Sequence, residues 1–338
     1  MTTTRQQILG LSGYAPALPT PFTDADEIDF AAFERLCDRL VQEGATALVV
    51  CGTTGEAPNL SREEHERIVR AAVEAVQGRI PVIAGAGSNC TTQAIELSRD
   101  AEAAGADAVL SVVPYYNKPT QAGMYAHFHA IAESTGLPII LHDVPARTVC
   151  SLSDDTVARL AEMPQVVGLK DATGDVTRPL RLRSLLGVDF RLLSGDDATA
   201  IAFIAQGGDG CISVTANVAP RLCHALYAAS QRGELAQARQ ISATVARLTA
   251  PLSRESNPTP LKYALSQMKF MSPRVRLPLV EPTSETRAAI DAALAHLWER
   301  YRDYVIGTPA RPDRAHPQAV SEIAARGRRL RGRRVLSS

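Results

Sequence analysis

The segment Val166-Val167-Gly168-Leu169-Lys170-Asp171-Ala172-Thr173-Gly174 joins an apolar run to a lysine and then to a polar turn that ends in glycine. An apolar run without polar interruption is typical of a strand covered on both faces, as in parallel sheets. We therefore expect a buried parallel strand with an amine at its C-terminal end. In βα barrels the chemical groups lie at the C-terminal ends of the strands.

Lys170 is a candidate nucleophile. Apolar surroundings disfavour its ammonium form, so that part of the population is a neutral amine, which can attack a ketone and form a Schiff base. The alternative is a lysine that ends the strand and pairs with Asp171. The segment by itself leaves both interpretations open.

Eight apolar runs alternate with stretches of helical period over residues 14–217. The expected strands are Ala15–Leu18, Ala47–Val50, Pro81–Ala84, Ala108–Val112, Pro138–Leu141, Val166–Leu169, Phe190–Leu193 and Gly210–Ser213. The clearest expected helices between them are Phe30–Glu43, Arg62–Val76, Thr91–Ala104, Gln121–Ser134 and Asp154–Glu162. The pattern predicts an α/β fold, a (β/α)8 TIM barrel. A doubly wound open sheet is the alternative, but no G-x-G-x-x-G follows the first strand.

The remaining residues divide into three regions. Residues 218–306 contain helical stretches without strands, which predict a helical C-terminal extension: Pro220–Gln231, Leu235–Leu248, Pro258–Met268 and Thr283–Tyr301. Residues 1–13 are a lead-in that lacks the apolar core of a secretory signal. Residues 307–338, with six arginines in 326–334, are expected to be a flexible basic tail.

The composition is that of an ordinary globular protein, with 36 basic and 36 acidic side chains in 338 residues. This balance gives no case for a nucleic acid or a membrane as partner, so we expect small-molecule substrates and a cytoplasmic location. Six cysteines without a C-x-x-C pair are expected to be reduced thiols, and no metal site is expected. Cys51, beside a glycine-rich turn, is expected to be a packing residue.

Polar groups follow three other expected strands. The turn Gly52-Thr53-Thr54-Gly55-Glu56 offers two hydroxyls and backbone N–H groups to a carboxylate, although it also fits an ordinary βα turn. Tyr115 and Tyr116 lie in a loop between prolines, where phenols serve as acid, base or packing groups. The segment 142–148 offers the imidazole of His142 and the guanidinium of Arg147, for which a surface ion pair is the alternative.

Together these segments resemble the dihydrodipicolinate synthase branch of the pyruvate-dependent class I aldolase family. The resemblance covers about residues 14–280 and rests on GTTGE at 52–56, PVIAGAGSN at 81–89, PYYNKP at 114–119, VPART at 144–148, GLKDATG at 168–174, LSGDD at 193–197, CISVTANV at 211–218 and ESNPTPLKYAL at 255–265. It implies a homotetramer or homodimer without a cofactor that condenses pyruvate with L-aspartate 4-semialdehyde in lysine biosynthesis.

The resemblance also implies roles for individual residues. Lys170 matches the Schiff-base lysine, Thr53 and Thr54 the hydroxyls that hold the pyruvate carboxylate, and Arg147 the arginine that holds the aldehyde substrate. The remaining matches are Thr53 in a proton relay, Tyr116 as a residue supplied to the neighbouring subunit's site, and Gly195 and Ile212 as backbone contacts near the Schiff base.

His142-Asp143 is a departure from this family, which carries Tyr-Asn there. Imidazole relays protons at neutral pH, so we expect His142 to be catalytic with Thr53 and to titrate near pH 6–7. Alternation along the strand should keep Asp143 out of the barrel interior. The change leaves open another pyruvate-dependent aldolase, dehydratase or lyase acting on 2-keto-3-deoxy sugar acids or N-acetylneuraminate, and a non-catalytic keto-acid-binding barrel.

An allosteric lysine site is the last feature that the resemblance implies. His65, Asn89 and Tyr115 keep its pattern. Gln93, however, stands in place of a glutamate, and Arg62 adds a positive charge. Losing the charge-assisted hydrogen bond of the glutamate weakens the binding of an ammonium. We therefore expect a weak response to lysine.

Overall fold

A computed structural model describes residues 3–301 of the chain. Its eight strands are parallel and form one sheet in the order β1-β8-β7-β6-β5-β4-β3-β2. A parallel bridge between Ala17 and Val49 joins the two ends of this sheet. The predicted (β/α)8 barrel is confirmed, and the doubly wound sheet is wrong.

The strands agree with the predicted positions to within about two residues at each end. They are β1 (Gly13–Pro16), β2 (Leu48–Val50), β3 (Val82–Gly85), β4 (Ala108–Val112), β5 (Ile139–Asp143), β6 (Val166–Asp171), β7 (Arg191–Ser194) and β8 (Gly210–Ser213). Both β5 and β6 extend two residues beyond their apolar runs. His142 and Lys170 therefore lie within strands, whose backbone fixes their position.

The helices cover the outside of the barrel and one of its flanks. They are α1 (Thr3–Leu9), α2 (Phe30–Gln42), α3 (Arg62–Val76), α4 (Thr91–Ala103), α5 (Gln121–Ala132), α6 (Pro145–Thr148), α7 (Asp154–Ala161), α8 (Arg178–Leu186), α9 (Ala200–Ala205), α10 (Pro220–Gln231), α11 (Leu235–Leu252), α12 (Thr259–Gln267) and α13 (Ser284–Arg300), with short 3₁₀ turns η1 (Ala57–Asn59) and η2 (Thr215–Asn217). The sequence pattern did not predict α1, α6, α8 or α9.

Helix starts follow from local capping. Ser61 accepts from the backbone N–H of Glu64, whose side chain in turn accepts from the backbone N–H of Ser61, so that α3 begins with a capping box. Asp29, Thr120, Ser153 and Thr283 cap four other helices in the same way through one side-chain oxygen. In the sequence, such Ser, Thr and Asp residues are the signals that predict where a helix begins.

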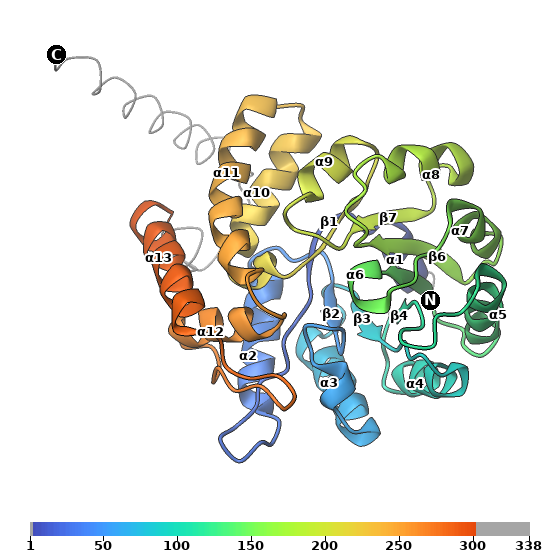
Figure 1. Cartoon of the computed structure of the whole chain (residues 1–338), viewed down its shortest axis with the longest axis horizontal. Coiled ribbons are helices and arrows are strands. Elements are labelled where there is room, and N and C mark those ends of the chain that lie inside the picture. Colours follow the sequence, from blue (N-terminus) through green and yellow to red (C-terminus); the bar gives the residue numbers. More distant parts are fainter. Residues whose placement is uncertain (1–2, 302–338) are drawn as a thin grey trace.

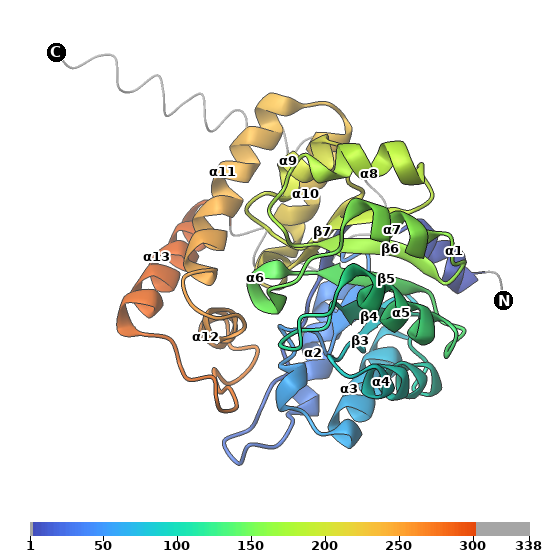
Figure 2. The ribbon, with the colours of Figure 1, turned by 45° about the vertical axis from the view of Figure 1, so that its right-hand side comes forward.

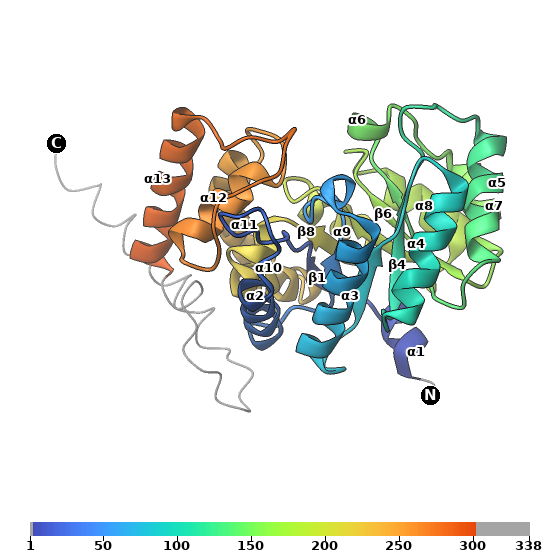
Figure 3. The same ribbon diagram turned by 90° about the horizontal axis from the view of Figure 1, so that it is seen from below.

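The barrel has two separate cores. An outer core lies between strands and helices, and a smaller inner core fills the barrel. The lead-in contributes to the inner core, because Ile8 and Leu11 pack there with Ala15 and Ile212. Figure 3 shows α1 and α6 at opposite ends of the barrel, so the lead-in helix covers the end away from the predicted site.

Helices α10 to α13 lie together on one flank of the barrel (Figures 1 and 2). They form the predicted helical C-terminal extension, with α10 packed on α11 and α13 on both α11 and α12. Residues 302–306 of that extension and the predicted basic tail, 307–338, lie outside the described residues. No helix within residues 3–301 is long and apolar enough to cross a membrane.

Candidate active site

Lys170 lies at the C-terminal end of β6 and is almost completely buried, with 9% of its surface exposed. Burial lowers the pKa of its amine to about 8, and the nearby charge of Arg147 acts in the same direction. A pKa near 8 leaves roughly one amine in ten neutral at pH 7. This is the nucleophilic form that the apolar sequence around Lys170 predicts.

The alternative, an ion pair between Lys170 and Asp171, is wrong. Asp171 accepts from Thr173 and from Arg178, whose Nη1 is 3.3 Å from the Asp171 Oδ2. The same Arg178 nitrogen lies 2.8 Å from the Oδ2 of Asp143. Arg178 thus holds the two carboxylates that follow His142 and Lys170 on neighbouring strands. Lys170 forms no ion pair within the described residues.

His142 is the register partner of Lys170 across β5 and β6, and it is buried. Burial lowers the pKa of its imidazole well below 6.5, and the charges of Lys170 and Arg147 lower it further. The expected titration near pH 6–7 is therefore corrected, because this imidazole is neutral at pH 7. Asp143 faces the other side of the strand, against Arg178, as alternation predicts.

A cavity of about 660 Å³ opens at the C-terminal ends of β2 to β5. Thr53, Arg147 and His142 line it, so three of the predicted site residues face one space. Lys170 is not among the residues that line this cavity, but it is the register partner of His142. Thr54 is buried beside it and accepts a hydrogen bond from Asn257 (2.9 Å). Within residues 3–301 no side chain pairs with the Arg147 guanidinium, whose charge is therefore available to a carboxylate.

Gly195, one of the two residues that the resemblance assigns to backbone contacts, lies close to Lys170. A Cβ atom at Gly195 would be 3.0 Å from Cε of Lys170 and 2.8 Å from Cβ of Ala172. The absence of a side chain at 195 therefore makes room for the lysine. Ile212, the other of the two, is part of the inner core.

Cys51 precedes the 52–56 turn and is fully buried. Burial raises the pKa of its thiol well above the ordinary value, so the thiol stays protonated and acts as a packing group. All six cysteines are free. Within residues 3–301 no group of three His, Cys, Asp or Glu side chains is arranged to hold a metal ion.

Tyr116 does not belong to the cavity of its own chain. It is 90% exposed and has a φ of +72°, in the left-handed region that non-glycine residues rarely adopt. Its loop thus presents a strained, exposed phenol to the surroundings. Tyr115 turns the other way and lines the cavity.

The same cavity is also lined by residues that the resemblance assigns to lysine binding. His65, Gln93 and Tyr115 line it, and Nε2 of His65 donates a hydrogen bond to the carbonyl of Gly85 (2.7 Å). Asn89 lies outside the lining residues, and its carbonyl accepts from Asn117. Asn89 is the one predicted residue of this group that does not face the cavity.

Comparison with known proteins places the chain in a family. The Dihydrodipicolinate synthetase family matches over residues 10–297. The 4-hydroxy-tetrahydrodipicolinate synthases of Cereibacter sphaeroides and Hyphomonas neptunium are 50% and 51% identical, over 85% and 84% of this chain and 98% and 97% of their own. The chain belongs to the dihydrodipicolinate synthetase family.

Solved structures of this family share the fold. The chloride-inhibited dihydrodipicolinate synthase from Acinetobacter baumannii, complexed with pyruvate, is 43% identical with a TM-score of 0.82, and the match covers 84% of this chain and 98% of that one. The enzyme from Cyanidioschyzon merolae with lysine bound is 36% identical, also with a TM-score of 0.82, over 84% and 97% of the two chains.

Two residues of the site region had no role in the sequence interpretation. Asn257 and Lys262 lie in the segment 255–265, which is one of the segments that resemble the family. In the structure they contact Thr54 and Glu56 of the 52–56 turn, about 200 residues earlier in the chain. No local pattern in this segment marks the two residues, because their partners lie far away in the sequence.

Proposed function

We propose that this protein is a Schiff-base-forming synthase that condenses pyruvate with L-aspartate 4-semialdehyde to 4-hydroxy-tetrahydrodipicolinate, in lysine and diaminopimelate biosynthesis. The observation that carries the proposal is the buried amine of Lys170, the register partner of His142, which lines one cavity together with Thr53 and Arg147. About 50% identity to synthases over most of the chain supports the same reaction.

The first half of the reaction makes an enamine. The neutral amine of Lys170 adds to the ketone carbon of pyruvate, and loss of water forms an imine. Thr53, Thr54 and the N–H groups of their turn hold the pyruvate carboxylate. The protonated imine withdraws electrons from C3, which loses a proton and becomes the enamine carbon. No metal is needed for this activation, because the imine nitrogen takes up the electron pair.

The second half joins the two substrates. The enamine carbon attacks the aldehyde carbon of the semialdehyde, whose carboxylate pairs with the open guanidinium of Arg147. A proton is delivered to the new alkoxide. The amino group of the second substrate then attacks the imine carbon, which closes the ring and releases Lys170.

His142 carries the proton transfers in this proposal. It lines the cavity next to Lys170, and its lowered pKa keeps a neutral nitrogen available to accept a proton at C3 or from Thr53. A phenol in the same position would act first as an acid. In this proposal, histidine in place of tyrosine therefore changes whether the side chain carries a transferable proton at the start of the reaction, but not the type of reaction.

Tyr116 acts in this proposal only through a second copy of the chain, because its own cavity does not include it. We propose a homodimer or homotetramer in which the loop that contains Tyr116 reaches the neighbouring site. The same proposal places the enzyme in the cytoplasm, where its small-molecule substrates are made and used.

Because His142 stands in place of the family tyrosine, the identity of the second substrate needs a direct test. A coupled assay should compare L-aspartate 4-semialdehyde with N-acetylneuraminate and with 2-keto-3-deoxy sugar acids. We expect the highest kcat/KM with the semialdehyde. A higher value with a sugar acid would support the alternative, a pyruvate-dependent aldolase or lyase of another specificity.

A further inference from the structure

The chain has four lysines, and two of them are buried. One is Lys170. The other is Lys262 on α12, whose Nζ lies 2.5 Å from Oε1 of Glu56 and 2.8 Å from the carbonyl of Arg274. Both side chains of this ion pair are completely inaccessible to solvent. The pair joins the C-terminal helices to the last residue of the 52–56 turn.

Glu56 is fully engaged by the C-terminal region and its own turn. Its second oxygen accepts from the backbone N–H of Arg276 (3.0 Å) and from the Asn59 side chain (3.3 Å). The backbone of Glu56 is left-handed, with φ of +56°, which non-glycine residues adopt only where the surroundings hold them. The ion pair with Lys262 is therefore part of what fixes the shape of the turn.

A second contact from the same region reaches Thr54 directly. The side-chain amide of Asn257 donates to the hydroxyl oxygen of Thr54 over 2.9 Å. Because this oxygen accepts a hydrogen bond there, the Thr54 proton is free to point to another acceptor. An anion held by the turn is such an acceptor.

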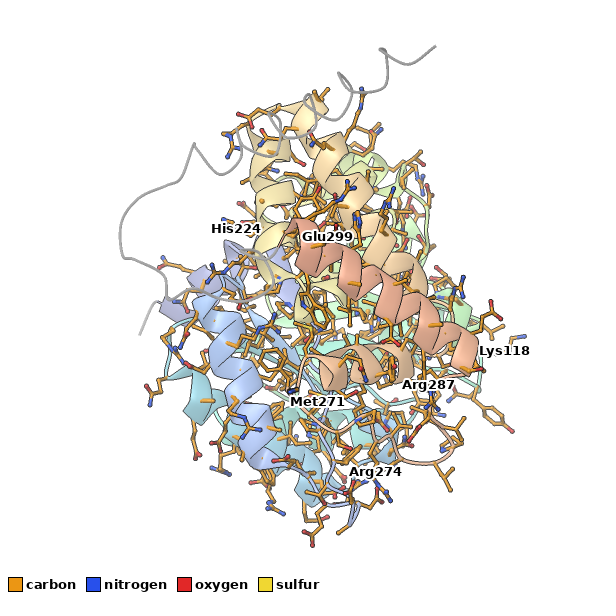
Figure 4. The ribbon with its side chains drawn as sticks, turned by 90° about the vertical axis from the view of Figure 1, so that its left-hand side faces the viewer. Lys118, His224, Met271, Arg274, Arg287 and Glu299 are labelled. Atoms are coloured by element: carbon orange, nitrogen blue, oxygen red, sulfur yellow. The ribbon has the colours of Figure 1, made fainter. Side chains whose placement is uncertain are left out.

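The segment after α12 also supports the wall of the cavity. Arg276 binds the carbonyl of Asn59 (2.9 Å) and both oxygens of Glu64 at the start of α3. The ring of Phe22 contacts two cations, with Lys262 Nζ at 4.1 Å and Arg276 Cζ at 4.3 Å from its centroid. Figure 4 shows Arg274 and Met271 on this segment, below α12.

We propose that Lys262 is a positioning residue which, together with Asn257, holds the 52–56 turn in the shape that fits the carboxylate of a 2-keto acid. The role rests on the proposed function, since it assigns the turn to pyruvate. It makes the helical C-terminal extension a working part of the keto-acid site. The proposed role also predicts different effects on the binding of the two substrates. Arg147, on α6, which is proposed to hold the aldehyde substrate, makes no contact with the Lys262–Glu56 pair.

The test must separate positioning from simple loss of stability. Removing only Lys262 leaves a buried, unpaired carboxylate, which destabilises a protein strongly, whereas removal of both charges is tolerated better. The informative protein is therefore the double variant Glu56→Gln/Lys262→Met. Lys269→Met, an exposed lysine just after α12, is the matched control.

Steady-state kinetics should be measured with the concentration of each substrate varied in turn. The temperature should be one at which circular dichroism shows that the double variant and Lys269→Met are both folded. We expect the double variant to raise KM for pyruvate roughly tenfold to a hundredfold, the effect of one misplaced charge-assisted hydrogen bond. KM for the aldehyde should change by less than about twofold, within the scatter of a site that keeps its contacts. Lys269→Met should leave both values unchanged.

Equal changes in both KM values, or none in either, would overturn the positioning role while wild-type turnover stands. A wild-type protein that forms no imine with pyruvate would overturn the proposed function and this role with it. Asn257→Ala provides a second route to the same result, because it removes the donor to Thr54 without touching the ion pair. It should shift KM for pyruvate in the same direction.

Discussion

His142 and Lys170 lie side by side as register partners on β5 and β6, and the residues that follow them, Asp143 and Asp171, share one nitrogen of Arg178 on the opposite face. The inner face thus carries an imidazole and an amine whose pKa values are both lowered, first by burial. The outer face carries the charges that fix the two strand ends. Nucleophile and proton acceptor are held by the same pair of strands.

Replacement of His142 tests its role in proton transfer. We expect His142→Gln to lower kcat by about 10²- to 10⁴-fold, the usual contribution of a general acid or base. His142→Tyr, which restores a group that can exchange protons, should keep more activity than His142→Gln. Full activity of His142→Gln would show that the imidazole only packs.

The pH dependence of kcat gives a second test of His142. Its pKa is lowered well below 6.5, so the neutral form persists as pH falls from 7 through 6.5 and is lost only at lower pH. Because the protonation of Lys170 affects both proteins alike, the ratio of wild-type kcat to His142→Gln kcat reports on His142 alone. We expect this ratio to stay level over that interval and to fall at lower pH. A fall of the ratio that begins at or above pH 6.5 would contradict the lowered pKa of the buried imidazole.

Gly195→Ala tests the space around the nucleophile. The added Cβ would lie 3.0 Å from Cε and 3.2 Å from Cγ of Lys170, so the amine must move. We expect imine formation with pyruvate to slow by about tenfold to a hundredfold, because small displacements of a reacting group are costly. Gly123→Ala, within α5, is the control: its added Cβ would lie 3.3 Å from Cβ of Pro119 and would not contact Lys170, so imine formation should keep its rate. An unchanged rate for Gly195→Ala would mean that the lysine reacts from another position.

Mixing two inactive variants tests the role of Tyr116. If Tyr116 completes the neighbouring site, Lys170→Ala and Tyr116→Phe are each inactive, but mixed dimers contain one intact site. Random reassociation should then restore about a quarter of the wild-type sites, since half of the dimers are mixed. No recovery after mixing, with mixed dimers shown by native mass spectrometry, would argue against a shared site.

Gln93 and Arg62, the two residues behind the expected weak response to lysine, both have partners within the chain. Gln93 accepts from Ser88 (2.9 Å), and Arg62 pairs with Asp100 and Glu96. The Arg62 charge is thus compensated, but the glutamate that would hold the lysine ammonium is still lacking. We expect half-inhibition only above about a millimolar. Half-inhibition below about a millimolar would contradict this expectation and would direct attention to Glu96, the carboxylate that also lines the cavity.

The parts of the fold and site that sequence predicted are those that local pattern encodes. Val166–Leu169 reads as a buried strand because it has no polar side chain on either face, and the structure places Val166 and Leu169 in the outer core and Val167 in the inner core. The sequence did not predict α8 or α9. The apolar residues of the arginine-rich α8 show only a weak helical period, and α9 has only six residues. Their helical state depends on packing against the barrel.

The features of the site that the sequence did not predict depend on contacts between segments that are distant in the chain. Asn257 and Lys262 meet the 52–56 turn only after the chain has closed the barrel and returned, so no local pattern predicts them. The lowered pKa of His142 has the same origin, because it depends on burial and on charges from other segments. A sequence supplies the ordinary pKa of an imidazole but not the environment that shifts it.

Reduction with borohydride in the presence of pyruvate tests the central claim most directly. Peptide mass analysis should find the reduced pyruvate adduct on Lys170 and on none of the other three lysines, with a yield that rises as pH increases toward 8, where the Lys170 amine becomes neutral. Lys170→Ala should abolish the adduct. An unmodified Lys170 in a protein shown to bind pyruvate would contradict the account and favour a keto-acid-binding barrel without catalysis.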